Sequence, residues 1–118
     1  MRRRLDAVLF LDKPSGMTSN GALQVAKRLF GAGKAGHSGT LDPLASGLLP
    51  VLFGEATKFS QFLLDSDKEY LADVRLGVTT STGDAEGEVT ARRAVDVSDA
   101  AIEAALARFR GEFAQIPP

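Results

Sequence analysis

Apolar and polar positions in the first part of the chain predict a strand followed by a helix. Residues 7–11 form a short apolar run that ends at the turn-forming segment 12–16, a pattern typical of a buried strand that leads into a turn. Thr18 or Ser19 can then cap a helix that extends to about Phe30. The apolar residues expected on one face of this helix are Leu23, Ala26, Leu29 and Phe30.

The middle of the chain predicts a long loop, a second strand and a second helix. Residues 34–47 contain three glycines and one proline with few periodic apolar positions, which indicates a loop with its own shape. Residues 48–53 predict a buried strand, in which Pro50 favours an edge strand or a strand end. Residues 55–64 predict a helix whose apolar side is formed by Phe59, Phe62 and Leu63.

The last part of the chain predicts a strand, a hairpin and a helix. Residues 70–76 alternate between apolar and polar side chains, which predicts a half-exposed strand, and residues 89–95 are expected to pair back after the turn-forming segment 79–88. Ser98 can cap an amphipathic helix that ends at Gly111. The mixed order of elements predicts an α+β fold with a mixed, largely antiparallel sheet, flanking helices and a single core.

Composition narrows the class of protein. The chain has 118 residues, 44% of them hydrophobic, which suits one ordinary domain. No apolar stretch approaches the roughly 20 residues that span a bilayer, and no signal peptide follows the N-terminal arginines, so we expect a soluble cytoplasmic protein without a membrane partner. With no cysteine and one histidine, we also expect no bound metal.

The net charge of −1 conceals an asymmetry between the two halves of the chain. Residues 1–64 carry eight Lys/Arg and four Asp/Glu, whereas residues 65–118 carry six and eleven. Any capacity to bind phosphate therefore belongs mostly to the first half. The candidates for phosphate contacts are Lys13, Lys27, Arg28, Lys34 and Lys58.

The segment 34–43 concentrates the residues that carry chemistry. It contains the sole histidine, His37, together with Asp42, two hydroxyl side chains and a lysine. A phosphate-binding P-loop is excluded because Lys34 is followed by alanine and Arg28 occupies the place of the first glycine. A hydrolase elbow is disfavoured because its glycine spacing is one residue short. From the residues alone, a glycine-rich turn with Thr40 and Asp42 as backbone caps stays open.

The sequence KAGHSGTLDPLASGLLPV, residues 34–51, resembles the signature of the tRNA pseudouridine synthase B family. The resemblance extends to LDKPSGMTSN at residues 11–20 and to the segments 54–59 and 67–70, and it covers roughly residues 7–118. The sequence LASG after Asp42-Pro43 resembles the stand-alone bacterial form and not the guide-RNA-dependent dyskerin type. We therefore expect a pseudouridine synthase-like catalytic fold that needs no guide RNA.

The resemblance implies that Asp42 is the catalytic carboxylate. The family converts a uridine in the tRNA T loop to pseudouridine by breaking the N1–C1′ bond, turning the base and rejoining it through C5, without a cofactor. A carboxylate beside C1′ can stabilise positive charge, attack the carbon or remove a proton, and the sequence leaves these roles open. By the same resemblance, His37 contacts the flipped nucleotide or the phosphate bend, and Tyr70 stacks on the base.

Two other classes of protein compete with this interpretation. A non-catalytic RNA-binding module would keep the fold, but the joint presence of Asp42, His37 and Tyr70 counts against it. A metabolic phosphate-binding enzyme is excluded because the glycine and lysine spacing of the loop does not match a phosphate-binding loop. Family members continue beyond Pro118 with further strands, an active-site arginine and often an RNA-binding domain. We therefore expect residues 1–118 to be the N-terminal portion of a monomeric enzyme's catalytic domain, inactive alone and weakly bound to tRNA.

Overall fold

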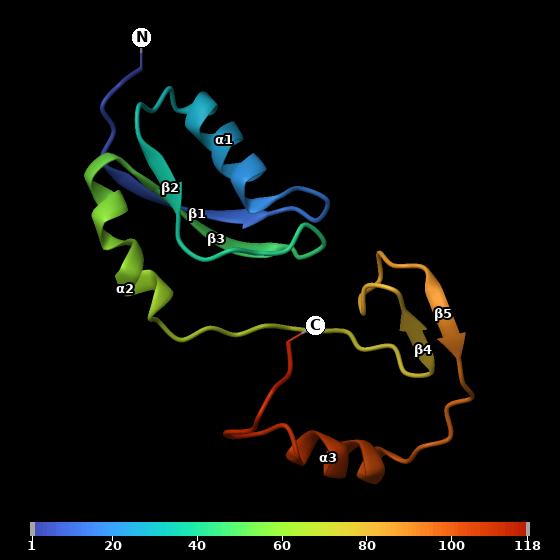
Figure 1. Cartoon of the computed structure of the whole chain (residues 1–118). Helices are drawn as coiled ribbons and strands as arrows, with labels where there is room; N and C mark the ends of the chain where they lie inside the picture. Colours follow the sequence, from blue (N-terminus) through green and yellow to red (C-terminus); the bar gives the residue numbers. More distant parts are fainter. Residues whose placement is uncertain (1, 118) are drawn as a thin grey trace. The chain divides into compact units, whose positions relative to one another are not determined.

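The computed structural model describes residues 2–117 and divides the chain into two compact units, Met1–Glu69 and Tyr70–Pro118. The first unit contains β1 (Ala7–Lys13), α1 (Ser19–Leu29), β2 (Ala35–His37), β3 (Gly47–Phe53), the 3₁₀ helix η1 (Gly54–Phe59) and α2 (Ser60–Leu64). The second contains β4 (Val78–Thr80), β5 (Val89–Arg92) and α3 (Asp99–Ala107) (Figure 1). The α+β class is confirmed, with two separate antiparallel sheets in place of one mixed sheet.

The sheet of the first unit has the strand order β1-β3-β2, with both pairings antiparallel. The two predicted strands are confirmed, and their register runs from Ala7 opposite Phe53 to Lys13 opposite Gly47. The expectation that Pro50 marks an edge strand is wrong, because β3 is the central strand. Its missing N–H is tolerated because β2 pairs only with residues 51–53, so Pro50 has a strand partner on one side alone.

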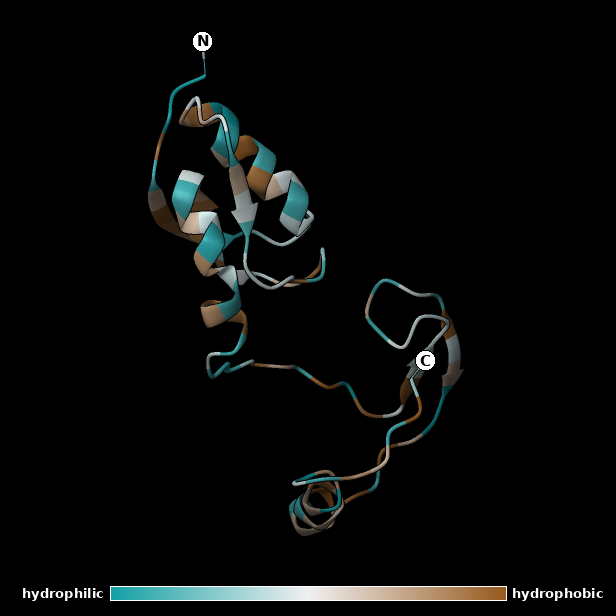
Figure 2. Ribbon diagram, turned by 60° about the vertical axis from the view of Figure 1, so that its left-hand side comes forward, coloured by the Kyte–Doolittle hydropathy of each residue, from teal (hydrophilic) through white to brown (hydrophobic). Residues whose placement is uncertain are grey.

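The core of the first unit lies between α1 and one face of this sheet. Leu23 and Ala26 of α1 pack with Val51 and Phe53 of β3 in one buried cluster, and Figure 2 shows apolar and hydrophilic bands alternating along the helix. Two predicted members of the helix face behave differently. Phe30 packs edge-on against Phe53, with ring centroids 5.5 Å apart. Leu29 is 79% exposed, because Phe30 takes the position against the sheet.

The opposite face of the sheet is apolar and partly exposed. Val8 and Phe10 of β1 and Leu48 of β3 point away from α1 and are exposed, whereas Leu52, which lies opposite Val8 on the same face, is buried. The predicted single helix over residues 55–64 divides into η1 and α2, and Phe59 and Phe62 are exposed, Phe62 by 74%. Within residues 2–117 nothing buries these two rings, whose centroids lie 6.0 Å apart.

The second unit is a hairpin and a helix with little burial. The predicted strand over residues 70–76 is absent, because no neighbouring segment supplies the ladder of hydrogen bonds that a strand needs. Residues 89–92 pair back antiparallel as predicted, but their partner is β4, in the segment expected to form the turn, and not residues 70–76. The helix α3 begins after Ser98, whose Oγ accepts a hydrogen bond from the N–H of Ala101. The buried residues of the described chain all lie in the first unit, and the second unit contributes none.

The junction of β3 and η1 depends on a glycine. Gly54 has φ +60°, and an added Cβ would lie 2.2 Å from Asp6 Oδ1 and 2.3 Å from the Leu5 carbonyl oxygen. We expect Gly54→Ala to destabilise the first unit by at least about 2 kcal/mol, measured by urea unfolding. Gly31→Ala is the matched control, because it has the same φ and open space around its Cβ. Equal losses for both variants would contradict the steric explanation.

Candidate active site

Asp42 lies in the connection between β2 and β3, residues 38–46, here called the aspartate loop. The predicted long loop over residues 34–47 therefore contains a short strand, β2, which pairs with the end of β3. Within the loop the N–H of Ala45 donates to the Asp42 carbonyl oxygen at 2.9 Å, which closes a turn after the aspartate. The side chain of Asp42 is exposed, and no hydrogen bond or ion pair holds its carboxylate within residues 2–117.

Lys13 ties the aspartate loop to the end of β1. Its side chain is completely buried, and its Nζ donates to the carbonyl oxygens of Pro14 at 2.8 Å and Met17 at 2.7 Å. A third, longer contact of 3.5 Å reaches the carbonyl oxygen of Pro43, the residue after Asp42. The ammonium group offers three donors, so these carbonyls replace its lost hydration. The expectation that Lys13 contacts phosphate is therefore wrong.

Ser19 and Gly16 hold the same loop from the other side of the turn. The Ser19 hydroxyl accepts a hydrogen bond from the Leu41 N–H and donates one to the Leu41 carbonyl oxygen, both at 2.9 Å. The Gly16 N–H donates to the Pro43 carbonyl oxygen at 2.7 Å. With Lys13, these contacts form what we call the loop clamp, which fixes the backbone on both sides of Asp42.

We expect Ser19→Ala to destabilise the first unit by about 1–3 kcal/mol. Ser19 is buried, and its loss leaves both polar groups of the Leu41 backbone without their partner. The urea unfolding midpoint measures the effect. Ser15→Ala serves as the control, because Ser15 is exposed in the same turn. An unchanged midpoint for Ser19→Ala would show that these hydrogen bonds contribute nothing to the loop.

His37 enters the aspartate loop from the end of β2. Its Nδ1 lies 2.5 Å from the Gly39 carbonyl oxygen, and a carbonyl only accepts, so Nδ1 carries the proton and donates. This bond orients the half-buried ring and leaves Nε2 as the nitrogen for an outside partner. The neighbouring Ser38 is buried, and its hydroxyl donates to the Ser60 carbonyl oxygen at 2.9 Å. Ser38 therefore anchors the loop to α2 and is held away from a nucleophile's role.

The alternative of a purely structural turn loses its basis here. Neither the Thr40 hydroxyl nor the Asp42 carboxylate caps a backbone group in the part of the chain that the structure describes. The loop is held by its backbone and by Lys13 and Ser19 instead. An exposed carboxylate without a partner, on a loop whose backbone is fixed on both sides, is suited to react with a bound molecule.

Tyr70 belongs to the second unit and begins its first segment. Its side chain is 69% exposed, so it is not an ordinary core residue. The structure thus brings His37 and Asp42 together on the aspartate loop and its flanking strand, and describes Tyr70 separately. Its predicted role in stacking stays a prediction.

Sequence reasoning missed the loop clamp. Lys13 and Ser19 lie in the segment LDKPSGMTSN, which was noted for its resemblance but not for its contacts with residues 41–43. A charged residue at the end of an apolar strand, directly before a Pro-Ser-Gly turn, was the available signal. It gave no indication that the side chain would turn back to the carbonyl oxygens of Pro14 and Met17, or that it would reach Pro43, which is 30 residues further on.

The remaining charged candidates are surface groups. Lys58 pairs with Glu55 one turn away, and this hydrogen bond and charge lower the pKa of Glu55 and raise that of Lys58. Asp84 accepts hydrogen bonds from Thr82 Oγ1 and the Glu86 N–H, which lower its pKa and shape the β4–β5 turn. Residues 2–117 contain no group of three acidic or histidine side chains placed to hold a metal, and no helix long and apolar enough to cross a bilayer.

The chain is similar to known proteins over most of its length. Residues 27–118 match the model of a family described as TruB family pseudouridylate synthase (N terminal domain). Proteins named tRNA pseudouridine synthase B from Azoarcus sp. and Burkholderia mallei are 68% and 67% identical over 117 residues, which are 99% of this chain and 39% of each relative. The chain therefore spans about two fifths of the length of these relatives.

Similar solved structures include one described as an H/ACA RNP bound to a substrate RNA containing 2′-deoxyuridine. The alignment has 49% identity and a TM-score of 0.47, and it covers 48% of this chain and 18% of that chain. A crystal structure of the archaeal box H/ACA sRNP Nop10-Cbf5 complex aligns with 51% identity and the same TM-score and coverage.

Proposed function

We propose, from the premise that this chain belongs to the TruB family of pseudouridylate synthases, that the whole protein isomerises a T-loop uridine of tRNA to pseudouridine. The observation that carries the proposal is the exposed Asp42 carboxylate on a loop fixed on both sides by the loop clamp. The relatives' name supports tRNA as the substrate. We further propose that the enzyme acts in the cytoplasm as a monomer, without a cofactor or a guide RNA.

In the proposed reaction Asp42 acts on the ribose of the target nucleotide. Breaking the N1–C1′ bond leaves its electron pair on the uracil and builds positive charge at C1′. The Asp42 carboxylate stabilises that charge, attacks C1′ or removes a proton. The base then turns, C5 bonds to C1′, the C5 proton passes to a base or to solvent to restore the ring, and N1 takes up a proton, so the product is an isomer of the substrate. Atoms and charge balance without an external donor, which agrees with a loop that needs only a positioned carboxylate.

The target uridine must leave the stacked loop before Asp42 can reach its C1′. We propose that His37 contacts the flipped nucleotide or the phosphate bend through Nε2. The Nδ1–H bond to Gly39 keeps this nitrogen available and ties its position to the aspartate loop. Since His37 lies five residues before Asp42 on the same connection, both side chains can serve one bound nucleotide.

We expect Tyr70→Phe to keep RNA affinity but slow the chemical step, and Tyr70→Ala to weaken both. The Phe ring retains stacking, worth about 1–3 kcal/mol per base, but loses the hydroxyl. Single-turnover rates and RNA affinity are to be measured in a chimera in which residues 1–118 replace the matching part of the Azoarcus relative, here called the Azoarcus chimera. If Tyr70→Ala behaves as the unsubstituted chimera, Tyr70 has no part in the reaction.

The proposal is tested by mapping which uridine of an unmodified tRNA the purified Azoarcus chimera converts. We expect one modified position, in the T loop, without added guide RNA or cofactor. Binding without conversion would favour the non-catalytic RNA-binding module. Conversion at a uridine outside the T loop would contradict the proposed substrate site.

A further inference from the structure

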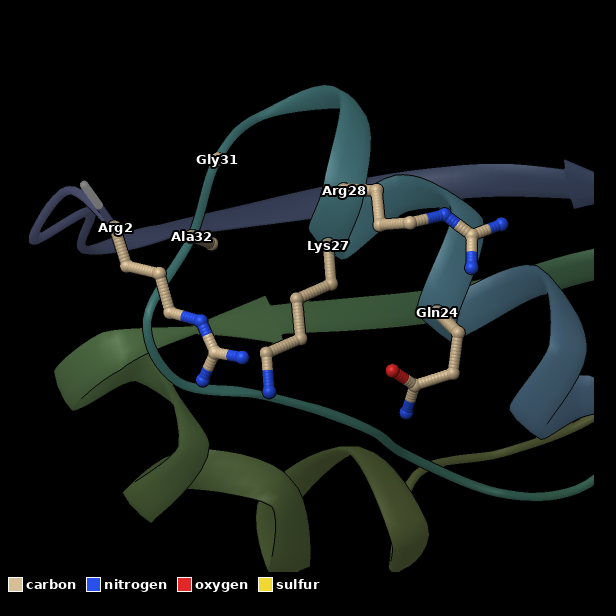
Figure 3. A pocket seen from close by; sticks show the side chains of 6 residues that line it. All are labelled: Arg2, Gln24, Lys27, Arg28, Gly31 and Ala32. Atoms are coloured by element: carbon tan, nitrogen blue, oxygen red, sulfur yellow. The ribbon is translucent and has the colours of Figure 1, made fainter.

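A pocket at the C-terminal end of α1 gathers three cationic side chains from two parts of the chain. Arg2 comes from the N-terminal segment, and Lys27 and Arg28 come from the last turn of α1. The cavity measures about 270 Å³, and Gln24, Gly31 and Ala32 complete its lining. Figure 3 shows the terminal nitrogen atoms of Arg2 and Lys27 directed towards the same space.

We propose that this basic pocket binds a backbone phosphate of the substrate RNA. The proposal rests on the proposed function, since it takes RNA as the substrate. It adds a contact point away from the aspartate loop, at the far end of α1.

Backbone contacts hold Arg2 at the pocket. Its neighbour Arg3 donates from its N–H to the Gly31 carbonyl oxygen at 2.7 Å and accepts from the Gly33 N–H at 3.1 Å. The Arg3 Nε donates to the Phe30 carbonyl oxygen at 2.6 Å. These three bonds fix the N-terminal segment against the turn after α1. Arg2 therefore reaches Lys27, which is 25 residues away in the sequence, from an ordered backbone.

The three cations lack an acidic partner in the part of the chain that the structure describes. The ion pairs found there join Lys58 to Glu55 and Arg110 to Glu103. Like charges that converge without a counterion repel one another, and a bound anion removes that repulsion. The arrangement thus favours a negatively charged ligand.

The helix dipole gives an incomplete explanation of the pocket. Cations in a last helical turn commonly balance its negative end. Here the carbonyl oxygens of Ala26, Lys27 and Arg28 already accept from backbone N–H groups at 3.0–3.1 Å. Arg2 is not part of the helix at all. Its presence at the pocket requires a reason other than the stability of α1.

The form of the pocket favours a phosphate within a polymer. Arg2 and Arg28 are exposed and Lys27 is half-buried, so solvent and salt weaken their hold on a single small anion. A backbone carries many phosphates and releases counterions when it binds. Ser19, which holds Leu41 beside Asp42, lies eight residues before Lys27 on α1, a distance of roughly 12 Å.

The test compares variants of the 118-residue chain in binding a fluorescein-labelled tRNA T stem-loop over a series of KCl concentrations. The triple variant Arg2→Gln, Lys27→Gln, Arg28→Gln removes the pocket's charge. The matched control, Arg75→Gln, Arg92→Gln, Arg93→Gln, changes the net charge equally on exposed residues of the second unit. The logarithm of the association constant decreases linearly with log[KCl]. We expect the steepness of this line to decrease by about 1 for each pocket cation removed, and by much less in the control.

Equal slopes for the pocket variant and the unsubstituted chain would overturn the proposal. If the triple variant loses α1, as judged by circular dichroism, Lys27→Gln is compared with Lys27→Arg, and only the charge-keeping change should preserve the slope. Inorganic phosphate is titrated at constant ionic strength. If phosphate displaces the RNA from these residues only at concentrations far above that of the RNA, the result supports a site for a backbone phosphate. If phosphate binds tightly and RNA does not displace it, the proposal is overturned.

The test of the basic pocket can fail or succeed independently of the test of the proposed function. A pocket effect on RNA binding together with full activity of Asp42→Asn would leave the pocket standing and reject the catalytic assignment. Loss of activity in Asp42→Asn with no pocket effect would do the reverse.

Discussion

Replacing Asp42 with asparagine in the Azoarcus chimera is expected to lower the single-turnover rate of pseudouridine formation by at least about 10³-fold. The change removes the charge but keeps the size of the side chain, so it should leave RNA affinity nearly unchanged. The loop should also keep its shape, because its contacts come from Lys13, Gly16 and Ser19 and not from the Asp42 carboxylate.

The control is Asp96→Asn, which removes an exposed carboxylate from the second unit. It should retain the rate of the unsubstituted chimera. Comparable rates for Asp42→Asn and Asp96→Asn would reject Asp42 as the catalytic group. A loss of RNA binding as large as the loss of rate would show instead that Asp42 contributes to substrate binding.

Replacing Lys13 with methionine is expected to destabilise the first unit by about 3 kcal/mol or more. Methionine fits the volume of the buried stem but leaves the carbonyl oxygens of Pro14 and Met17, and the weaker contact at Pro43, without a donor. Each hydrogen bond to a charged group contributes about 1.5–3 kcal/mol. Urea unfolding of the chain measures the loss.

The same change should reduce activity through the loop. In the Azoarcus chimera we expect Lys13→Met to lower the single-turnover rate at temperatures where the protein stays folded, because the backbone after Asp42 loses one of its anchors. Arg92→Met is the control, since Arg92 is exposed and lies in the second unit. A Lys13→Met variant as stable and as active as the control would show that the loop clamp does not need the ammonium group.

Elements defined by their own residues could be predicted from the sequence. Thr18 and Ser98 are confirmed as helix caps, each accepting a bond from an N–H three residues later. The pairing of residues 89–92 back onto a preceding segment is confirmed, although the partner is β4 and not residues 70–76. In these cases the signal and the contact lie within about a dozen residues, so local chemistry determines the structure.

Elements that depend on a distant partner could not be predicted from the sequence. Residues 70–76 have the alternation of a strand but no partner strand among the described residues, and Phe62 belongs to a helix without a covering surface. The sequence predicts a phosphate contact for Lys13, because lysine is seldom buried. Its burial depends on the carbonyl oxygens of Pro14 and Met17, together with a longer contact to Pro43, which the fold brings to the end of β1.

The candidate site itself was predicted in part. The resemblance singled out His37 and Asp42, and the structure places His37 at the end of β2 and Asp42 on the aspartate loop that follows it. The means by which the loop is held could not be read from spacing, because Ser19 and Leu41 are 22 residues apart and meet only through the packing of α1. Sequence motifs thus indicated the candidate site, and the fold supplied the contacts that position its loop.

The most direct test of the central claim is tritium release from tRNA labelled at C5 of its uridines, measured with the Azoarcus chimera and no other protein or cofactor. Rejoining the base through C5 expels that hydrogen, so each isomerisation is counted. We predict release comparable to that of the Azoarcus relative. A folded chimera that binds the tRNA but releases no tritium would contradict the claim that this chain supplies the catalytic loop of a tRNA pseudouridine synthase.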